Sequence, residues 1–163
     1  EKIRSSFKQK LLGFNYRMTN IQAALGISQM NKLNNFLSKR IEIKKIYDKF
    51  LNIENIIIPR INSFSKSTFH LYAIQVKPNK IKGIFRDNLL KELKKKKINA
   101  TIHYIPIHYH PYYKKMGFKK KQFKNSEKFY EQAISLPIHP ALKISEIKYV
   151  IKIIKDYIKK KYD

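Results

Sequence analysis

The chain has 163 residues, of which 43% are hydrophobic, and it contains no cysteine and carries a formal net charge of +25. A chain of this length can bury enough apolar surface for one compact domain. The absence of cysteine excludes a disulfide framework and a thiolate metal site. No apolar run approaches the roughly 18 residues that span a bilayer, so we expect a cytoplasmic protein without a membrane partner.

The positive charge has two interpretations. Clustered basic side chains neutralise phosphates, which would suit a lysine-rich module that binds nucleic acid or another polyanion. However, only five of the 36 basic residues are arginine, whose planar guanidinium is the usual group for recognising phosphates and base edges. The lysines instead recur along predicted helix faces, where their stems cover apolar surface and their charges stay in water. We therefore rank nucleic-acid binding as the weaker interpretation.

Helix and strand patterns alternate along the chain. Thr19, with Gln22 three residues later, forms a capping-box pattern that predicts one long helix from about Asn20 to about Leu51. Gly26 inside this helix indicates that another backbone packs close to it, because glycine otherwise costs about 1 kcal/mol there. The elements expected after this helix are strands over 55–60 and 69–76, a helix over 83–97, a strand over 98–104, a loop over 105–123, a helix over 126–133, a turn over 135–142 and a final helix from about Ser145.

Apolar residues recur on one side of several of these elements. In the strand over 69–76, Tyr72, Ile74 and Val76 share a face. The two later helices carry inward-facing stripes, which consist of Ile84, Leu89, Leu90 and Leu93 in the first and of Ile147, Val150, Ile151, Ile154 and Ile158 in the second. The order predicts an α+β domain, in which a long helix precedes a sheet of about three strands covered on one side by helices.

A run of histidines and tyrosines over 103–113, "HYIPIHYHPYY", is the first candidate site. It contains His103, Tyr104, His108, Tyr109, His110, Tyr112 and Tyr113. A zinc site needs at least three converging ligands, and no cysteine or nearby carboxylate completes a set here, so we expect no metal. Histidine and tyrosine present hydrogen-bonding groups on rigid apolar bodies, which suits a polar ligand with phosphates or hydroxyls.

Two further candidates are smaller. Asn15, Tyr16 and Arg17 stand directly before the predicted helix N-terminus, where an amide and a guanidinium favour an anion site. A capped loop with Arg17 paired to a surface carboxylate would show the same pattern. His70 lies in the predicted strand over 69–76 and is interpreted as a core histidine rather than a catalytic one.

Taken in order, these segments resemble the C-terminal part of the DegT/DnrJ/StrS-type sugar aminotransferases, enzymes of fold type I that depend on pyridoxal phosphate. The resemblance covers nearly the whole chain. Within that family, "HLY" and "HYIPIHYHPYYKKMGF" are most similar to the transaminases that make the altrosamine precursor of pseudaminic acid. The matching runs are "LGFNYRMTNIQAALGISQMNKLNNFLSKR", "FHLYAIQV", "RDNLLKELKKKKINATIHYIPIHYHPYYKKMGF" and "SEKFYEQAISLPIHP", followed by an amphipathic helix.

The resemblance implies an enzyme that transfers an amino group, from a donor such as glutamate, to a keto carbon of a UDP-linked sugar. Residues 1–18 would end the large cofactor domain, residues 19–51 would form the helix between the domains, and residues 52–163 would form the small C-terminal domain. Such an enzyme would act in the synthesis of bacterial amino sugars and surface polysaccharides.

The resemblance also implies roles for individual residues. In a homodimer, the loop that holds Asn15 and Arg17 would reach the pyridoxal phosphate of the other subunit, with Asn15 contacting the phosphate. The nucleotide-sugar side of the site would be lined by His103, Tyr104, His108, Tyr112 and Tyr113.

The family's Schiff-base lysine precedes the run "NYRMT", and no lysine of this chain stands in the matching context. We therefore assign no catalytic residue and expect the chain alone to bind the cofactor poorly and not to transaminate. Glu1, where an initiator methionine would stand, agrees with a C-terminal portion of a longer enzyme. Two other interpretations stay open, namely the polyanion-binding module and a non-catalytic remnant that serves as the dimer partner of an intact subunit.

Overall fold

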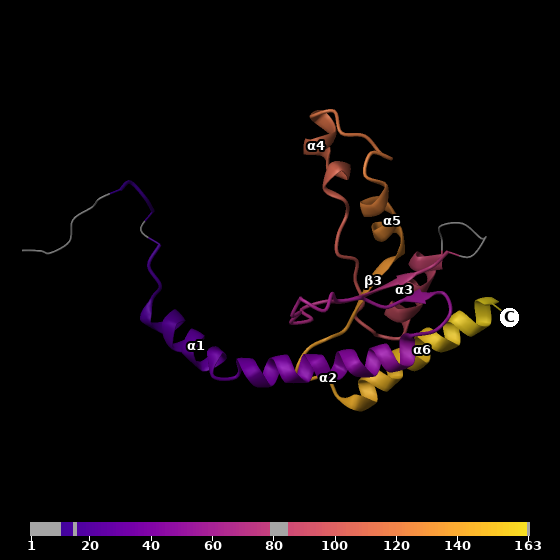
Figure 1. Cartoon of the computed structure of the whole chain (residues 1–163), viewed down its shortest axis with the longest axis horizontal. Coiled ribbons are helices and arrows are strands. Elements are labelled where there is room, and N and C mark those ends of the chain that lie inside the picture. The colour runs from indigo at the N-terminus through magenta and orange to yellow at the C-terminus, as the bar shows by residue number, and fades with distance from the viewer. Residues whose placement is uncertain (1–10, 15, 79–84, 163) are drawn as a thin grey trace, which may run out of the picture. The chain divides into compact units, whose positions relative to one another are not determined.

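A computed structural model describes residues 11–14, 16–78 and 85–162. Contacts divide the chain into two compact units, residues 1–33 and 34–163. No helix of the described residues is both long and apolar enough to cross a membrane. The elements in chain order are α1 (Asn20–Met30), α2 (Leu33–Leu51), β1 (Ile56–Ile57), β2 (Tyr72–Val76), α3 (Phe85–Lys95), the 3-10 helix η1 (Ile107–Tyr109), α4 (Pro111–Lys115), α5 (Lys124–Gln132), β3 (Ala133–Leu136) and α6 (Ile144–Tyr162) (Figure 1).

The first unit holds α1, whose N-terminus confirms the capping box. Thr19 N donates to Gln22 Oε1 at 2.9 Å, and Gln22 N donates to Thr19 Oγ1 at 3.3 Å. The predicted close packing of another backbone against Gly26 is wrong among the described residues, because a Cβ built on Gly26 would meet no heavy atom within 4 Å. In this unit, no described residue of α1 is buried.

The single helix predicted from Asn20 to Leu51 is wrong, since α1 ends at Met30 and a turn at 31–32 separates it from α2. Lys32 N donates to the carbonyl three residues back, Gln29 O, at 3.0 Å, which tightens the last turn of α1. Asn31 stands at this junction, and asparagine favours helix ends because its side chain competes for backbone hydrogen bonds.

The sheet of the second unit is antiparallel, with the strand order β1-β2-β3. Ile56 pairs with Val76, and Tyr72 pairs with Leu136. The number of strands is as predicted, but the third strand is not the expected one. Residues 98–104 contribute only an isolated bridge at Thr101, and residues 133–136, of which 135–136 were predicted as turn, supply β3. Strand pairing depends on distant partners, so alternation along 98–104 was not sufficient evidence for a strand.

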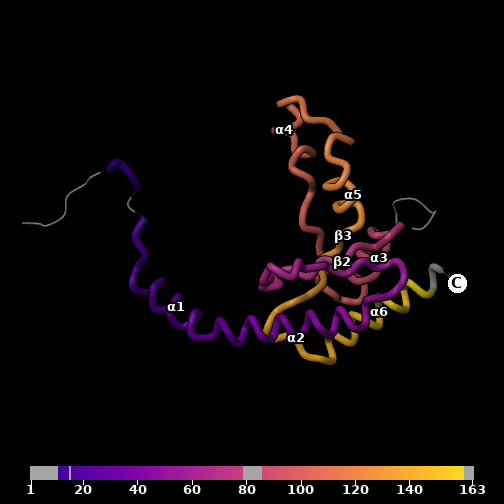
Figure 2. The backbone as a smooth tube through the Cα atoms, in the orientation of Figure 1, coloured from indigo at the N-terminus to yellow at the C-terminus, as the bar shows by residue number. Residues whose placement is uncertain are grey.

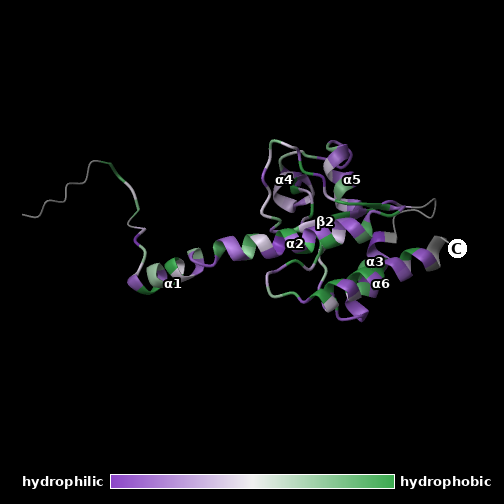
Figure 3. Ribbon diagram, turned by 60° about the horizontal axis from the view of Figure 1, so that its bottom comes forward, coloured by the Kyte–Doolittle hydropathy of each residue, from purple (hydrophilic) through white to green (hydrophobic). Residues whose placement is uncertain are grey.

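The hydrophobic core lies between the sheet and the helices α2, α3 and α6, and β2 shows the predicted alternation, with Tyr72, Ile74 and Val76 buried. All five residues of the predicted α6 stripe are buried, and in α3 so are Leu89 and Leu93, whereas Leu90 is half-buried and Ile84 lies outside the described residues. Figure 3 shows the amphipathic pattern along α6 as alternating hydrophobic and hydrophilic colours. Buried residues of the helices in this core include Ile43, Tyr47, Leu51, Leu89, Leu93, Ile147, Val150, Ile151, Ile154 and Ile158.

Polar side chains of α2 tie this helix to the loops around the sheet. Arg40 Nη1 donates to the carbonyl oxygens of Phe69 and Ile138, at 3.2 and 2.7 Å. Tyr47 is fully buried, and its hydroxyl donates to the carbonyl oxygen of Pro137 at 2.9 Å. These bonds satisfy backbone acceptors that no strand pairs. The core-histidine interpretation of His70 is wrong, since His70 precedes β2 and is exposed.

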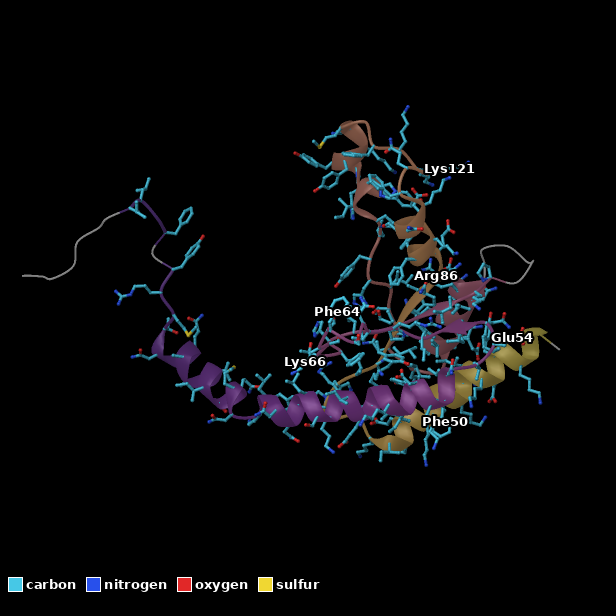
Figure 4. The ribbon with its side chains drawn as sticks, in the orientation of Figure 1. Phe50, Glu54, Phe64, Lys66, Arg86 and Lys121 are labelled. Atoms are coloured by element: carbon cyan, nitrogen blue, oxygen red, sulfur yellow. The ribbon has the colours of Figure 1, made fainter. Side chains whose placement is uncertain are left out.

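Between Thr101 and β3 the chain makes a long excursion, residues 102–132, which we call the arm. It leaves the sheet, passes through η1 and α4, and returns through α5 directly into β3 (Figure 2). Lys121 lies toward its outer end, and Arg86 of α3 lies near its base (Figure 4). Arg86 Nη1 donates to the carbonyl oxygen of Tyr130 at 2.7 Å, which anchors the end of α5 to α3. Where a loop was predicted over 105–123, the structure has two short helices, η1 and α4.

Candidate functional site

The predicted cofactor residues belong to the first unit. Asn15 lies outside the described residues, so its predicted role stays a prediction. Arg17 is exposed and stands two residues before the Thr19 cap of α1. The ion pairs recorded among the described residues do not include Arg17. A guanidinium at this place, next to helix N–H groups, can contact an anion such as a phosphate.

His103 and Tyr104 lie where the arm leaves the sheet. The nitrogen Nδ1 of His103 lies 2.8 Å from the Oγ of Ser135 in β3. The two aromatic rings of His103 and Tyr104 meet edge to face, with their centroids 4.6 Å apart. His103 is half-buried, whereas Tyr104 is 74% exposed. This pair therefore presents hydrogen-bonding groups to solvent from the sheet edge.

His108 lies inside the arm rather than on its surface. It is 6% exposed, and its Nε2 lies 2.8 Å from Oε1 of Glu127 in α5. The backbone N–H of Lys121 donates to the same carboxylate oxygen at 2.7 Å. Because an ionised carboxylate only accepts hydrogen bonds, the Nε2 of His108 carries the hydrogen of this pair. Glu127 thereby joins η1, α5 and the loop before α5.

The titration of Glu127 and Tyr109 reflects the same cluster. Burial alone would raise the pKa of Glu127, but hydrogen bonds from His108, Tyr109 and the backbone of Lys121 and Phe123 outweigh it and lower this pKa. Burial and the hydrogen bond to Glu127 raise the pKa of the Tyr109 hydroxyl. The ionised form of Glu127 is therefore the one that the arm is built to hold.

The arm also carries an open pocket of about 310 Å³. Aromatic rings dominate its wall, which also includes the buried His108. The ring centroids of His108 and Phe123 lie 4.8 Å apart. Tyr112 is 68% exposed and lies outside this wall, whereas Tyr113 forms part of it. The lining residues are Ile107, His108, Tyr113, Phe118, Phe123 and Ser126.

The predicted site residues thus fall into separate groups in the structure. His103 and Tyr104 lie together at the base of the arm, beside the sheet edge, and His108 and Tyr113 lie together on its pocket farther along the arm. No hydrogen bond or ring contact recorded between described residues joins these two groups. In the part of the chain that the structure describes, no group of three histidine, cysteine or acidic side chains is arranged to hold a metal ion.

Ser135 and Glu127 were not predicted as site residues. Each contacts a histidine that is distant in sequence, 32 residues away for Ser135 and 19 for Glu127. Neither residue stands in a local motif, since Ser135 lies in the apolar run "AISL" and Glu127 resembles any acidic residue near a helix start. Only the tertiary structure brings these residues to their histidines.

Comparison with known proteins identifies the family. Residues 2–155 match the DegT/DnrJ/EryC1/StrS aminotransferase family. The chain is 39% identical over 148 residues to the uncharacterized protein MJ1066 of Methanocaldococcus jannaschii, a match that covers 90% of this chain and 38% of that protein. It is 32% identical over 140 residues to the UDP-4-amino-4,6-dideoxy-N-acetyl-beta-L-altrosamine transaminase of Campylobacter jejuni strain 81-176. This match covers 85% of this chain and 36% of that transaminase.

Solved structures agree with this match. Helicobacter pylori PseC, an aminotransferase involved in the biosynthesis of pseudoaminic acid, superposes with a TM-score of 0.81 at 28% identity, covering 96% of this chain and 42% of PseC. The PLP-form of the sugar aminotransferase Spr1654 from Streptococcus pneumoniae superposes with a TM-score of 0.81 at 29% identity. This match covers 88% of this chain and 36% of Spr1654. A PMP-form of Spr1654 is also known, as expected of a family that depends on pyridoxal phosphate.

The chain therefore spans about two fifths of the length of these relatives. Its helices and small antiparallel sheet correspond to the C-terminal part of a fold-type-I sugar aminotransferase. The resemblance predicted from the sequence is thus confirmed, and the chain belongs to the DegT/DnrJ/EryC1/StrS aminotransferase family.

Proposed function

We propose that this chain supplies the C-terminal part of a pyridoxal-phosphate-dependent aminotransferase that acts on a UDP-linked keto sugar, with glutamate as the amino donor. The observation that carries the proposal is the match of residues 2–155 to one family of sugar aminotransferases. The relative from Campylobacter jejuni and the structure of PseC favour a role in the synthesis of amino sugars of the pseudaminic acid type. The enzyme would work in the cytoplasm, where nucleotide sugars are made.

In this proposal the first unit serves the cofactor, which when bound carries the amino group between donor and sugar. Arg17 fits a contact with its phosphate, because Arg17 is an exposed cation just before a helix N-terminus. Asn15 is proposed for the same phosphate on the family resemblance alone. In the homodimer that we propose, this loop would serve the cofactor of the other subunit.

The sugar side of the site is proposed for the second unit. His103 and Tyr104 offer a ring nitrogen and a hydroxyl at the sheet edge, and the exposed Tyr112 adds a further hydroxyl on the arm. His108 is buried against Glu127, so we propose that it supports the arm and thereby places Tyr113.

The domain boundaries follow the same reasoning. We propose that residues 1–18 end a large cofactor domain, that residues 19–51 connect the two domains, and that residues 52–163 form the small domain. Apolar side chains of the first unit support this arrangement, because Leu12, Phe14, Ile21 and Leu25 are each more than half exposed. Apolar surface of this kind is normally covered by another domain or subunit.

UDP binding tests the proposed function on the chain itself. In a titration followed by NMR, UDP is expected to shift the signals of His103 and Tyr104, and GDP is expected to shift them less. An oligonucleotide of random sequence serves as the matched control. If the oligonucleotide binds tightly with a steep salt dependence while UDP shifts no signal, the chain is a polyanion-binding module and the proposal is wrong.

A second test concerns catalysis by the chain alone. Incubated with pyridoxal phosphate and then gel-filtered, the chain is expected to retain no cofactor absorbance and to show no transaminase activity, since no lysine stands in the family's Schiff-base context. A stable yellow complex that glutamate bleaches would contradict this expectation and would place a functional lysine within these residues.

A further inference from the structure

We propose that Ser135 is a positioning residue that holds His103 with its proton on Nε2, so that Nε2 donates to an oxygen acceptor of the nucleotide sugar. The identity of that ligand rests on the proposed function. The tautomer of His103 is inferred only from the contacts of Ser135 with its neighbours. None of the sequence motifs indicated these contacts.

The backbone of Ser135 fixes the chain segment that leads to His103. Ser135 N donates to Thr101 O at 2.8 Å, and Thr101 N donates to Ser135 O at 3.2 Å. On its other side Ser135 pairs with Ala73 of β2, so it lies within a three-stranded arrangement. Ser135 itself is 5% exposed. His103 therefore stands two residues after Thr101, whose backbone is bonded to the sheet.

The side chain of Ser135 then orients the imidazole ring. Its Oγ lies 2.8 Å from Nδ1 of His103, an ordinary hydrogen-bond length. Thr101 Oγ1 lies 3.5 Å from both ring nitrogens. An oxygen equally far from both nitrogens lies along neither lone pair, and 3.5 Å is long for a hydrogen bond. Among the described residues, Ser135 is therefore the one group that makes a short, directed hydrogen bond with this ring.

The direction of that bond follows from the burial of Ser135. Its hydroxyl hydrogen needs an acceptor, and among the described residues the recorded partner of Oγ is Nδ1 of His103. When the serine donates to Nδ1, the neutral imidazole carries its own hydrogen on Nε2. This nitrogen belongs to a half-buried ring beside the exposed Tyr104. It can therefore donate to a phosphate, hydroxyl or carbonyl oxygen of a ligand.

Long-range proton–nitrogen NMR spectra of the histidine rings test the proposal without any ligand. They would be recorded on the 163-residue chain at about pH 8.5, where free histidine is neutral, and a His103→Gln variant would identify the signals of His103. The wild-type spectrum is expected to show the tautomer with hydrogen on Nε2. A spectrum with hydrogen on Nδ1 would overturn the proposal.

Substitutions of Ser135 separate positioning from general stability. Ser135→Ala is expected to release the ring into a mixture of both tautomers, whereas Ser135→Thr retains a hydroxyl and is expected to keep the wild-type spectrum. An unchanged spectrum in Ser135→Ala would overturn the proposal. Circular dichroism would verify the fold, and if Ser135→Ala does not fold, Ser135→Cys tests the same point, because its weak thiol donor is expected to give an intermediate spectrum.

UDP as the probe tests the ligand part. Its dissociation constant is expected to rise about tenfold in Ser135→Ala, which corresponds to the loss of about one hydrogen bond. In Ser135→Thr the dissociation constant is expected to stay unchanged. In the His103→Gln background, Ser135→Ala is expected to add no further loss. An equal loss in both backgrounds would overturn the positioning role. If UDP shifts no signal of the wild type, the proposed ligand is wrong, while the tautomer spectra still decide the role of Ser135.

Discussion

The two units of the chain use similar apolar residues with opposite results. In α1 of the first unit, Ile21 and Leu25 are 83% and 61% exposed, whereas in α6 of the second unit Ile147 and Ile154 are buried. Both helices carry isoleucines and both are regular. The difference teaches that apolar residues at helical spacing identify the face of a helix that is suited to burial. They do not identify the part of the molecule that packs against that face.

Truncation in the core of the second unit should have the largest effect. Ile154→Ala removes a fully buried side chain from the cluster between α6 and the sheet. We expect a loss of about 2–5 kcal/mol in the free energy of unfolding, from lost burial and from the cavity left behind. Urea denaturation of the chain would measure it. A loss below about 1 kcal/mol would mean that α6 is not part of a packed core.

A partly buried hydrogen bond of the same unit should have the next largest effect. The hydroxyl of Tyr72 donates to Asp48 Oδ1 at 2.8 Å, and Tyr72→Phe leaves that acceptor with one donor fewer. We expect a loss of about 1.5–3 kcal/mol, the range for bonds to charged groups, measured by urea denaturation at pH 7. An unchanged midpoint would contradict a role for this bond in joining β2 to α2.

The tyrosines also predict a loss of stability in alkali. Burial, and for Tyr72 also the bond to Asp48, raise the pKa of Tyr47 and Tyr72 well above the usual value. A raised folded-state pKa means that the stabilisation is present below about pH 10, the unfolded value, and is lost as the pH rises above it. The urea midpoint should fall beyond about pH 10. Tyr72→Phe should show a smaller fall than the wild type.

The arm should respond locally rather than globally. Glu127→Gln removes the charge that accepts from His108 and Lys121 N. Amide exchange of 121–132 should quicken about tenfold, while exchange in α6 stays unchanged. Because the folded pKa of Glu127 is lowered, the stabilisation of the arm is present above the ordinary carboxyl pKa and is lost as the pH falls below it. An equal increase in amide exchange in the arm and in α6 would contradict an arm that opens separately from the core.

The smallest effect should come from the first unit. Leu25→Ala removes an apolar side chain that is more than half exposed, and alanine is at least as favourable in a helix. We expect the free energy of unfolding of this chain to change by less than about 0.5 kcal/mol. A loss as large as that of Ile154→Ala would mean that α1 is packed in solution, for example against a second copy, and sedimentation would reveal that copy.

Local chemistry determined much of this protein. Thr19 and Gln22 specify the start of α1, because a capping box involves only neighbouring residues. The isoleucine stripe of α6 specifies its buried face, because helical spacing alone puts those residues on one side. The ordered runs around "NYRMTN" and "HYIPIHYHPYY" were also enough to identify the family.

The tertiary structure decided what depends on distant partners. Whether residues 98–104 or 133–136 complete the sheet depends on which segment reaches β2, and both segments are extended enough to pair. The histidines of one motif likewise separate, His103 to Ser135 and His108 to Glu127. Sequence determined the groups that can form hydrogen bonds, whereas only folding decided which of them are buried and which remain available to a ligand, because burial is a property of the whole packed chain.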